Sequence, residues 1–273
     1  MEVHRLGWSR TLGKKIVPSV GVLFRTRFAQ ELLSFVEVGA QILQGKGAGT
    51  GWDEEAETRV AIPHLPKDAV VFDVGANQGD WSRNLLSRVK HPIRLFLFEP
   101  QASCGPALAD LSDRCTIVQA ALGRAGGEIE LFSAGAMDDT ASVYQRADSF
   151  LADKPLHRQT VPVMSLDAFV DENAIKHISY MKLDVEGHEL SVLEGARALL
   201  PRIEVIVSEF WMFKIDGEEM ATFTALVTWL DQAGFVLYDI GALHGRSSDN
   251  RLQSGDAVFV RRNSTLVANS SWA

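Results

Sequence analysis

The 273-residue sequence has few cysteines and no long hydrophobic run. Its two cysteines, Cys104 and Cys115, are too few for a disulfide framework or a cysteine-rich metal site. No apolar stretch reaches the roughly 18–20 residues that a membrane-spanning helix needs, so we do not expect this chain to be an integral membrane protein. Hydrophobic residues make up 46% and charged residues 23% of the chain. This composition is typical of a folded globular protein and excludes a wholly disordered chain.

The charge is distributed unevenly along the chain. The formal net charge is −8, yet residues 1–27 contain six basic side chains and only one acidic side chain. The remaining residues therefore have a net charge of −13. An acidic body repels the phosphates of DNA and RNA, so we expect no nucleic-acid partner.

The basic start lacks the features of a signal peptide. The apolar stretch at residues 16–24 is short, contains Pro18 and Gly21, and has no clear small-residue cleavage site. We therefore expect a cytoplasmic protein whose arm is loosely ordered or makes weak contact with an anionic membrane surface.

An extension precedes the main domain in our prediction. Apolar side chains recur every three or four residues between 28 and 44, which is the periodicity of an amphipathic helix. The glycine-rich run at 45–51 then breaks this pattern. It is not a phosphate-binding P-loop, because its lysine is followed by glycine instead of serine or threonine. We predict a basic arm, a helix and a flexible linker over residues 1–52, and one α/β domain over residues 53–273.

Strand-length apolar runs alternate with helical patterns through most of this domain. The predicted strands are residues 70–74, 94–98, 116–120, 178–183 and 205–208, and the predicted helices are residues 80–89, 102–112, 188–200 and 217–233. Such alternation predicts a parallel sheet that is covered on both faces. Two further strands, 235–240 and 257–261, are joined by a loop too short for a parallel crossover, so we expect an antiparallel hairpin.

Residues 125–165 interrupt the alternation. Strand-like runs at 128–132 and 160–164 flank a polar loop that contains the segment Asp-Asp-Thr-Ala-Ser-Val at 138–143. A long loop inside a compact domain is often a lid or a binding loop. The segment is therefore either a lid over a ligand or a plain surface turn.

The strongest local signal is the turn after the first predicted strand. Asp73 lies near the end of that strand, and Gly75, Ala76, Asn77 and Gly79 lead into a helix. Glycine lets a backbone turn tightly beside a ligand, and a helix N-terminus offers N–H groups to an anion. The spacing D-x-G-x-N-x-G resembles the D/E-x-G-x-G-x-G turn of S-adenosylmethionine-dependent methyltransferases, with asparagine where glycine is usual. Asparagine tolerates the left-handed backbone region nearly as well as glycine. Taken alone, the turn can also be an ordinary strand–helix connection.

An acid at the end of the second predicted strand strengthens this interpretation. Glu99 lies 20 residues after Gly79, and a carboxylate at that place can accept hydrogen bonds from ribose hydroxyls. The alternative for Glu99 alone is a solvated carboxylate at a strand end. The two signals together are stronger than either one.

A third motif identifies the family that the sequence resembles. Residues 180–189, Tyr-Met-Lys-Leu-Asp-Val-Glu-Gly-His-Glu, and residues 192–196, Val-Leu-Glu-Gly-Ala, are similar to the K-x-D-x-E-G-x-E and V-L-x-G-A signature of FkbM-type methyltransferases. The glycine turn and Glu99 resemble the first two motifs of that family, in the same order. The resemblance covers roughly residues 68–262 and leaves the arm out.

The resemblance implies a Rossmann-like class I methyltransferase fold of the α/β class. We expect a seven-stranded, mostly parallel sheet with an antiparallel last strand, here with an N-terminal helical extension. The resemblance also implies S-adenosylmethionine as cofactor and methylation of a hydroxyl on a sugar or a natural-product-like small molecule. The family is broad, so the acceptor itself does not carry over, and the sequence is silent on oligomeric state.

Ligands of open α/β sheets bind at the carboxyl ends of the strands, so the candidate residues should converge there. We expect the glycine turn to face the methionine part of the cofactor, Glu99 to hold the ribose and Ala121 to lie beside the adenine. Asp184 approaches the methionine amino group or the acceptor. The expected cofactor-binding residues are Asp73, Gly75, Ala76, Asn77, Gly79, Glu99, Ala121 and Asp184.

The expected catalytic residues are Asp184, Glu186, His188 and Glu209. A neutral hydroxyl is a poor nucleophile, so a base or a metal ion must remove its proton. His188 is either this base, since imidazole titrates near neutral pH, or an exposed residue at a helix start. Glu186 and Glu189 can instead cap that helix. The sequence leaves open whether a divalent ion binds between Asp184 and Glu209, because it offers no evident third ligand.

Two other classes of function stay open as well. The main alternative is a non-catalytic binding or scaffold protein that retains the methyltransferase fold. The other is an NAD-dependent oxidoreductase, and Asn77 argues against it because the dinucleotide fingerprint G-x-G-x-x-G does not fit the turn.

Overall fold

The computed structural model describes residues 65–145, 156–214, 220–245 and 251–268, and five helical residues between 32 and 40. Those five lie inside the helix predicted for the extension. The chain divides into two compact units, Met1–Lys46 and Gly47–Ala273, a few residues before the predicted boundary. The basic arm and the glycine-rich linker fall outside the described residues, so their roles stay predictions. Within the described part, no helix is long and apolar enough to cross a bilayer.

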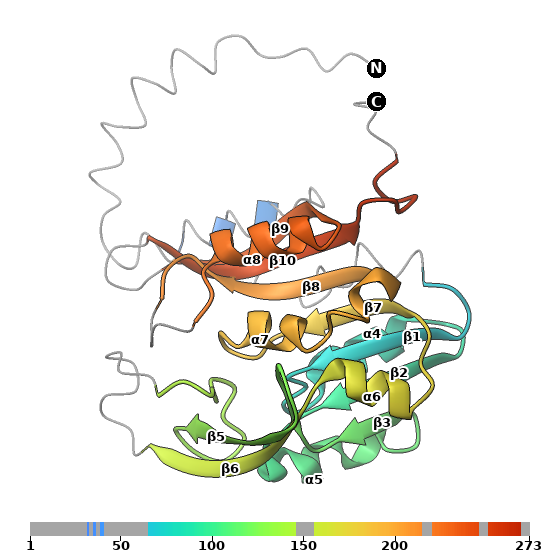
Figure 1. Ribbon diagram of the computed structural model, residues 1–273. Coiled ribbons are helices and arrows are strands. Elements are labelled where there is room, and N and C mark those ends of the chain that lie inside the picture. The colour runs from blue at the N-terminus through green and yellow to red at the C-terminus, as the bar shows by residue number, and fades with distance from the viewer. Residues whose placement is uncertain are drawn as a thin grey trace, which may run out of the picture. The chain divides into compact units, whose positions relative to one another are not determined.

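A seven-stranded sheet organises the second unit (Figure 1). Its strands are β1 (Ala69–Val74), β2 (Ile93–Phe98), β3 (Cys115–Val118), β7 (Ile178–Leu183), β8 (Ile203–Trp211), β9 (Phe235–Gly245) and β10 (Leu252–Arg261). They lie in the order β3-β2-β1-β7-β8-β10-β9. The pairs from β3 to β8 are parallel, whereas β10 is antiparallel to both of its neighbours. The predicted fold, including the antiparallel last strand and the final hairpin, is confirmed.

The helices are less regular than the sequence predicts. They are α4 (Asp80–Arg88), α5 (Gly105–Leu108), α6 (Leu166–Glu172), α7 (Glu189–Glu194) and α8 (Phe223–Gln232). The single helix predicted at 102–112 is wrong: it is α5 between two 3₁₀ turns, because Pro106 lacks an N–H and fits only a first helical turn. The helix predicted at 188–200 ends at Glu194, and α8 begins later than predicted, at Phe223.

Apolar side chains cover both faces of the sheet, as a parallel sheet requires. One buried cluster packs α6, α7 and α8 against the sheet, and these helices lie on the near side in Figure 1. The other cluster packs α4 and α5 against the opposite face. All six residues of β7 are buried. In the first cluster, the rings of Phe72, Phe96, Phe98 and Phe169 meet edge to face, with centroids 4.9–5.9 Å apart.

The interruption at residues 125–165 contains a second, smaller sheet. Its strands are β4 (Ala121–Leu122), β5 (Gly127–Ser133) and β6 (His157–Met164), in the order β4-β6-β5. The two strands predicted there are present and pair antiparallel. This sheet follows β3 directly, so it begins at the carboxyl end of a strand of the main sheet, which is the end where the site is predicted.

Replacing Phe72 by alanine should destabilise the domain strongly. The side chain is fully buried and contacts three other rings, so we expect the free energy of unfolding to fall by about 3–5 kcal/mol. Chemical denaturation measures this loss. The control is Leu243→Ala on the edge strand β9, where the side chain is 52% exposed and the expected change is about 0.5 kcal/mol or less. Equal losses in the two variants would contradict this placement of the core.

Candidate functional site

A cavity of about 320 Å³ opens at the carboxyl ends of β1, β2 and β7. Residues 74–78 line it after β1, residues 98–101 after β2, and residues 184–186 after β7. Three strand ends that are far apart in sequence therefore share one cavity. This is the place that open α/β sheets use for ligands.

Six of the eight predicted cofactor-binding residues line this cavity, and two do not. The six are Gly75, Ala76, Asn77, Glu99, Ala121 and Asp184. Gly79 is absent from the lining because it packs against α5: a Cβ on Gly79 would lie 2.7 Å from the side chain of Leu108. Asp73 is fully buried below the cavity. The prediction that these two residues face the cofactor is therefore not matched by their positions.

The glycine turn follows the predicted left-handed backbone path. Gly75, Asn77 and Gly79 have φ values of +83°, +45° and +86°. A Cβ on Gly75 would lie 1.7 Å from the carbonyl oxygen of Asp184. Glycine is therefore required at position 75 by the neighbouring strand end as well as by the turn.

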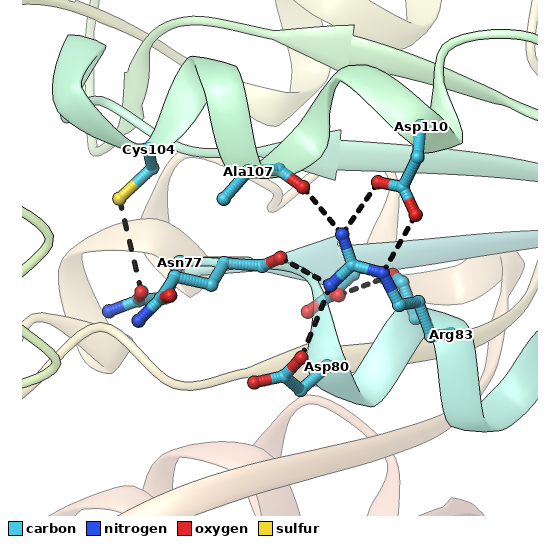
Figure 2. Close-up of polar contacts among 9 residues, drawn as sticks. Asn77, Asp80, Arg83, Cys104, Ala107 and Asp110 are labelled. Atoms are coloured by element: carbon cyan, nitrogen blue, oxygen red, sulfur yellow. Dashed lines mark hydrogen bonds and ion pairs between the residues drawn. The ribbon is translucent and has the colours of Figure 1, made fainter.

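Arg83 on α4 holds this turn from outside the cavity (Figure 2). Its guanidinium donates to the carbonyl oxygen of Gln78 at 2.6 Å and to both carboxylate oxygens of Asp110 at 2.6 and 3.0 Å. It also contacts the carbonyl of Ala107 and the carboxylate of Asp80. The hydrogen bonds to Asp110 raise the pKa of Arg83 further. One planar cation thus joins the glycine turn to the segment around α5.

Glu99 is placed as a ribose ligand would be. It is 4% exposed, and its two carboxylate oxygens accept hydrogen bonds from the backbone N–H groups of Asn77 at 2.7 Å and Gln101 at 2.8 Å. A carboxylate has about four acceptor positions, so each oxygen can still accept a hydroxyl. Burial raises the pKa of Glu99, and the two backbone hydrogen bonds oppose that rise.

Asp73 lies below the cavity, beside Lys182. Its carboxylate accepts a 2.6 Å hydrogen bond from Ser82 and lies 4.0 Å from the ammonium of Lys182. Lys182 lines the cavity and donates to the carboxylate of Asp184 at 3.0 Å. Burial raises the pKa of Asp73, although Lys182 and Ser82 lower it. Lys182 is part of the K-x-D motif, but the sequence alone assigned it no role.

Asp184, Glu186 and Glu209 form what we call the acid trio. One carboxylate oxygen from each lies within 4.8 Å of the others. Asp184 and Glu186 line the cavity, while Glu209 lies outside its lining and accepts a 3.2 Å hydrogen bond from the indole of Trp211. Burial, followed by the negative charges of Glu186 and Asp184, raises the pKa of Glu209 well above its usual value. The sequence paired Asp184 with Glu209, and the left-handed turn at Glu186 adds the third carboxylate.

The acid trio has oxygen donors of the kind that hard divalent ions prefer. Its ammonium neighbour Lys182, however, already neutralises part of the charge of Asp184. Three clustered carboxylates with such a neighbour do not by themselves define a metal site, so the metal ligands stay unassigned.

His188 lines the cavity at the start of α7, as predicted, but its environment makes it a weak base. Burial lowers its pKa to about 4, and the positive charge of Arg124 contributes to the same shift. Its Nδ1 is buried and has no hydrogen-bond partner among the described residues. The ring is therefore neutral at pH 7, and its basicity is far from the optimum for a general base at that pH.

Glu189 binds the turn that precedes α7 and not the first N–H groups of the helix, so its capping role stays a prediction. Its carboxylate is buried and accepts hydrogen bonds from the N–H groups of Val185 at 3.2 Å and Gly187 at 3.1 Å. Burial raises the pKa of Glu189 to about 7. The carboxylate of Glu186 belongs to the acid trio, and its capping role also stays a prediction.

The segment 138–143 forms a wall of the cavity, so it is not a plain surface turn. Asp138, Asp139, Ala141 and Val143 line it. The carbonyl oxygen of Asp138 accepts hydrogen bonds from the side-chain amides of Asn77 at 3.3 Å and Gln101 at 2.9 Å. The asparagine that replaces the usual glycine therefore fastens this segment to the turn. Gln101 had no sequence signal beyond its position two residues after Glu99.

The Methyltransferase FkbM domain profile matches residues 73–237, which is more than half of the chain and includes most of this cavity. The chain belongs to the FkbM methyltransferase family. This assignment gives no support to the oxidoreductase alternative.

Two curated relatives are similar over part of their length. The hexuronic acid methyltransferase AglP of Haloferax volcanii is 26% identical over 161 residues, which are 57% of this chain and 62% of that protein. The 2-O-methyltransferase NoeI of Sinorhizobium fredii is 26% identical over 156 residues, which are 52% of this chain and 63% of that protein. The chain thus matches less than two thirds of either relative.

A solved structure, the methyltransferase FkbM of Methylobacillus flagellatus, aligns with a TM-score of 0.43 and 17% identity. The alignment covers 71% of this chain and 43% of that one.

Asn77→Gly should weaken cofactor binding without disturbing the turn. Glycine accepts the left-handed backbone at this position, while the hydrogen bond from the side chain to Asp138 is lost. One such hydrogen bond contributes about 0.5–1.5 kcal/mol, so affinity for S-adenosylhomocysteine should fall roughly two- to tenfold in titration calorimetry. The midpoint of thermal unfolding serves as the control for the fold. Unchanged affinity would show that the segment 138–143 does not close over the ligand.

Proposed function

We propose that this chain is a cytoplasmic S-adenosylmethionine-dependent methyltransferase that methylates a hydroxyl of a sugar or a natural-product-like small molecule. The observation that carries the proposal is the convergence of Asn77, Glu99 and Asp184 on one cavity. Membership of the FkbM family supports the same activity.

The cofactor would lie across the three strand ends. The glycine turn receives the methionine part, and Glu99 accepts the ribose hydroxyls with its remaining acceptor positions. Ala121, at the start of β4, lies beside the adenine. Lys182 and Asp184 form a close ion pair at the methionine end and can bind its carboxylate and its amino group respectively.

Methyl transfer is an in-line displacement in which the acceptor oxygen attacks the methyl carbon and the carbon–sulfur bond breaks. S-Adenosylhomocysteine leaves, and the hydroxyl proton must pass to a base. We assign that proton to Glu209, because its carboxylate lies within 4.8 Å of those of Asp184 and Glu186, which line the cavity. Burial raises its pKa, so its ionised form is a stronger base than an ordinary carboxylate. Asp184 and Glu186 orient the acceptor by accepting hydrogen bonds from its neighbouring hydroxyls. His188, with a pKa of about 4, contributes to the wall of the cavity and is a poorer base.

The two curated relatives support a sugar as the acceptor class. One is named for a hexuronic acid and the other for a 2-O position. Neither is similar enough to transfer its own substrate to this chain.

Glu209→Gln separates the two candidate bases. We expect turnover at saturating cofactor to fall at least about 100-fold, because general-base catalysis contributes roughly 10²–10⁴-fold. His188→Ala should lower turnover far less. Affinity for S-adenosylhomocysteine, measured by calorimetry, should stay close to that of the unmodified protein in both variants. A larger loss of turnover in His188→Ala would reverse the assignment.

Incorporation of labelled methyl groups into a panel of sugars and glycosides tests the activity itself. A folded sample that binds S-adenosylhomocysteine and methylates an acceptor supports the proposal. A folded sample that shows no binding at millimolar cofactor supports the non-catalytic scaffold instead. Dialysis against EDTA, followed by addition of Mg²⁺, belongs in the same assay. A loss of activity that Mg²⁺ restores would show that the reaction needs a divalent ion, for which the acid trio is the candidate site among the described residues.

A further inference from the structure

The peptide group between Glu186 and Gly187 is held in an unusual conformation. Glu186 has a φ of +55° and Gly187 has a φ of +98°, so two successive residues are left-handed. Such a conformation is costly for a residue other than glycine and persists only when the surroundings impose it. The neighbouring side chains therefore have to account for it.

Two buried side chains bind this one peptide group from opposite sides. The N–H of Gly187 donates to the carboxylate of Glu189 at 3.1 Å. The carbonyl oxygen of Glu186 accepts a 2.8 Å hydrogen bond from the hydroxyl of Ser142. Both polar atoms of the peptide group are thus fixed, one by α7 and the other by the segment between β5 and β6.

Ser142 is itself fixed firmly enough to impose a position on its partner. It is 2% exposed, and its backbone exchanges two hydrogen bonds with Phe132 of β5, at 2.8 and 2.9 Å. Its hydroxyl oxygen also accepts a hydrogen bond from the N–H of Tyr144 at 3.2 Å. The hydroxyl therefore reaches the β7–α7 turn from the second sheet, across 44 residues of sequence.

The left-handed conformation of Glu186 decides where its carboxylate points. Rotation about the N–Cα bond of Glu186 moves its Cβ and its carbonyl group together, and the hydrogen bond from Ser142 to that carbonyl oxygen opposes this rotation. A return to the ordinary negative φ would move the side chain away from Asp184 and Glu209, whose carboxylates now lie within 4.8 Å of it. The acid trio therefore depends on a hydroxyl that is not a member of it.

We propose that Ser142 is a positioning residue that holds Glu186 in the acid trio. The inference deepens the proposed function and rests on it for the catalytic consequence. Ser142 does not line the cavity and contributes no atom to the reaction. Through Glu186 it acts on the part of the site proposed for the acceptor, although its neighbours in the segment 138–143 line the cavity proposed for the cofactor.

Ser142→Ala removes the hydroxyl and little else. We expect turnover to fall at least about tenfold, since small displacements of a reacting group can cost up to roughly 100-fold. Affinity for S-adenosylhomocysteine should change less than about twofold, because no predicted cofactor ligand moves. The matched control is Ser165→Ala, which removes the N-cap hydroxyl that accepts from Ala168 on α6, away from the cavity. That variant should lower the thermal midpoint and leave turnover unchanged.

A second readout does not require activity. The sequence contains two Glu–Gly pairs, at 186–187 and at 194–195. Protein labelled with ¹³C-carbonyl glutamate and ¹⁵N-glycine therefore gives two carbonyl–amide cross-peaks. In Ser142→Ala the Glu186–Gly187 peak should shift, and the amide of Gly187 should exchange faster. The Glu194–Gly195 peak should stay in place as an internal reference.

The two readouts give distinguishable outcomes. A shifted Glu186–Gly187 peak together with the loss of turnover supports the inference. An unshifted peak, or a shifted peak with turnover like that of Ser165→Ala, overturns it. If the unmodified protein neither binds S-adenosylhomocysteine nor transfers methyl groups, the proposed function fails. The peaks then still decide whether Ser142 holds the peptide group.

Discussion

The site depends on the close approach of β1 and β7 where the two strands end. The backbone of Gly75 lies so near the carbonyl of Asp184 that a Cβ has no room. This contact places the glycine turn after β1 beside the turn after β7. The N–H groups of Gly75 and Ala76 also donate hydrogen bonds to the carbonyl oxygen of Phe98 at the end of β2, so the ends of all three strands are joined. Parallel pairing supplies the alignment, since the carboxyl ends of parallel strands lie at one edge of the sheet.

Charge is arranged around that contact in a consistent way. A fully buried aspartate, Asp73, lies beneath Lys182, and Lys182 in turn pairs with Asp184 at the cavity surface. An ionised carboxylate without such a partner would be costly to bury. The K-x-D motif therefore takes part in a series of charged contacts that begins at Asp73 in the core and ends at Asp184 in the cavity.

The parts of this site that the sequence predicts are those set by backbone conformation and strand order. Gly75 and Asn77 are left-handed, and Glu99 and Asp184 lie at strand ends, so spacing was sufficient to find them. Asp73 is fully buried below the cavity, and spacing alone does not reveal this burial. Local periodicity also predicted longer helices than the structure has: Pro106 interrupts the one predicted at 102–112, and α7 ends at Glu194.

Contacts between distant segments had no local signal. The third carboxylate of the acid trio requires the left-handed turn at Glu186, and that turn depends on Ser142 and Glu189. The low pKa of His188 follows from burial, which a single sequence does not show. The sequence was enough to predict which residues lie at the site. Their pKa shifts and hydrogen-bond partners could be described only from the packed structure.

The charge of the cavity wall has a consequence for the reaction cycle. Among the described residues that line it, six are acidic, namely Asp80, Glu99, Asp138, Asp139, Asp184 and Glu186, against one lysine. An electronegative wall attracts a cation more strongly than an uncharged molecule of the same shape. In the proposed reaction the sulfonium of the donor becomes a neutral thioether when the methyl group departs. In that reaction the attraction between the acidic wall and the donor weakens when the methyl group leaves, which favours release of the product.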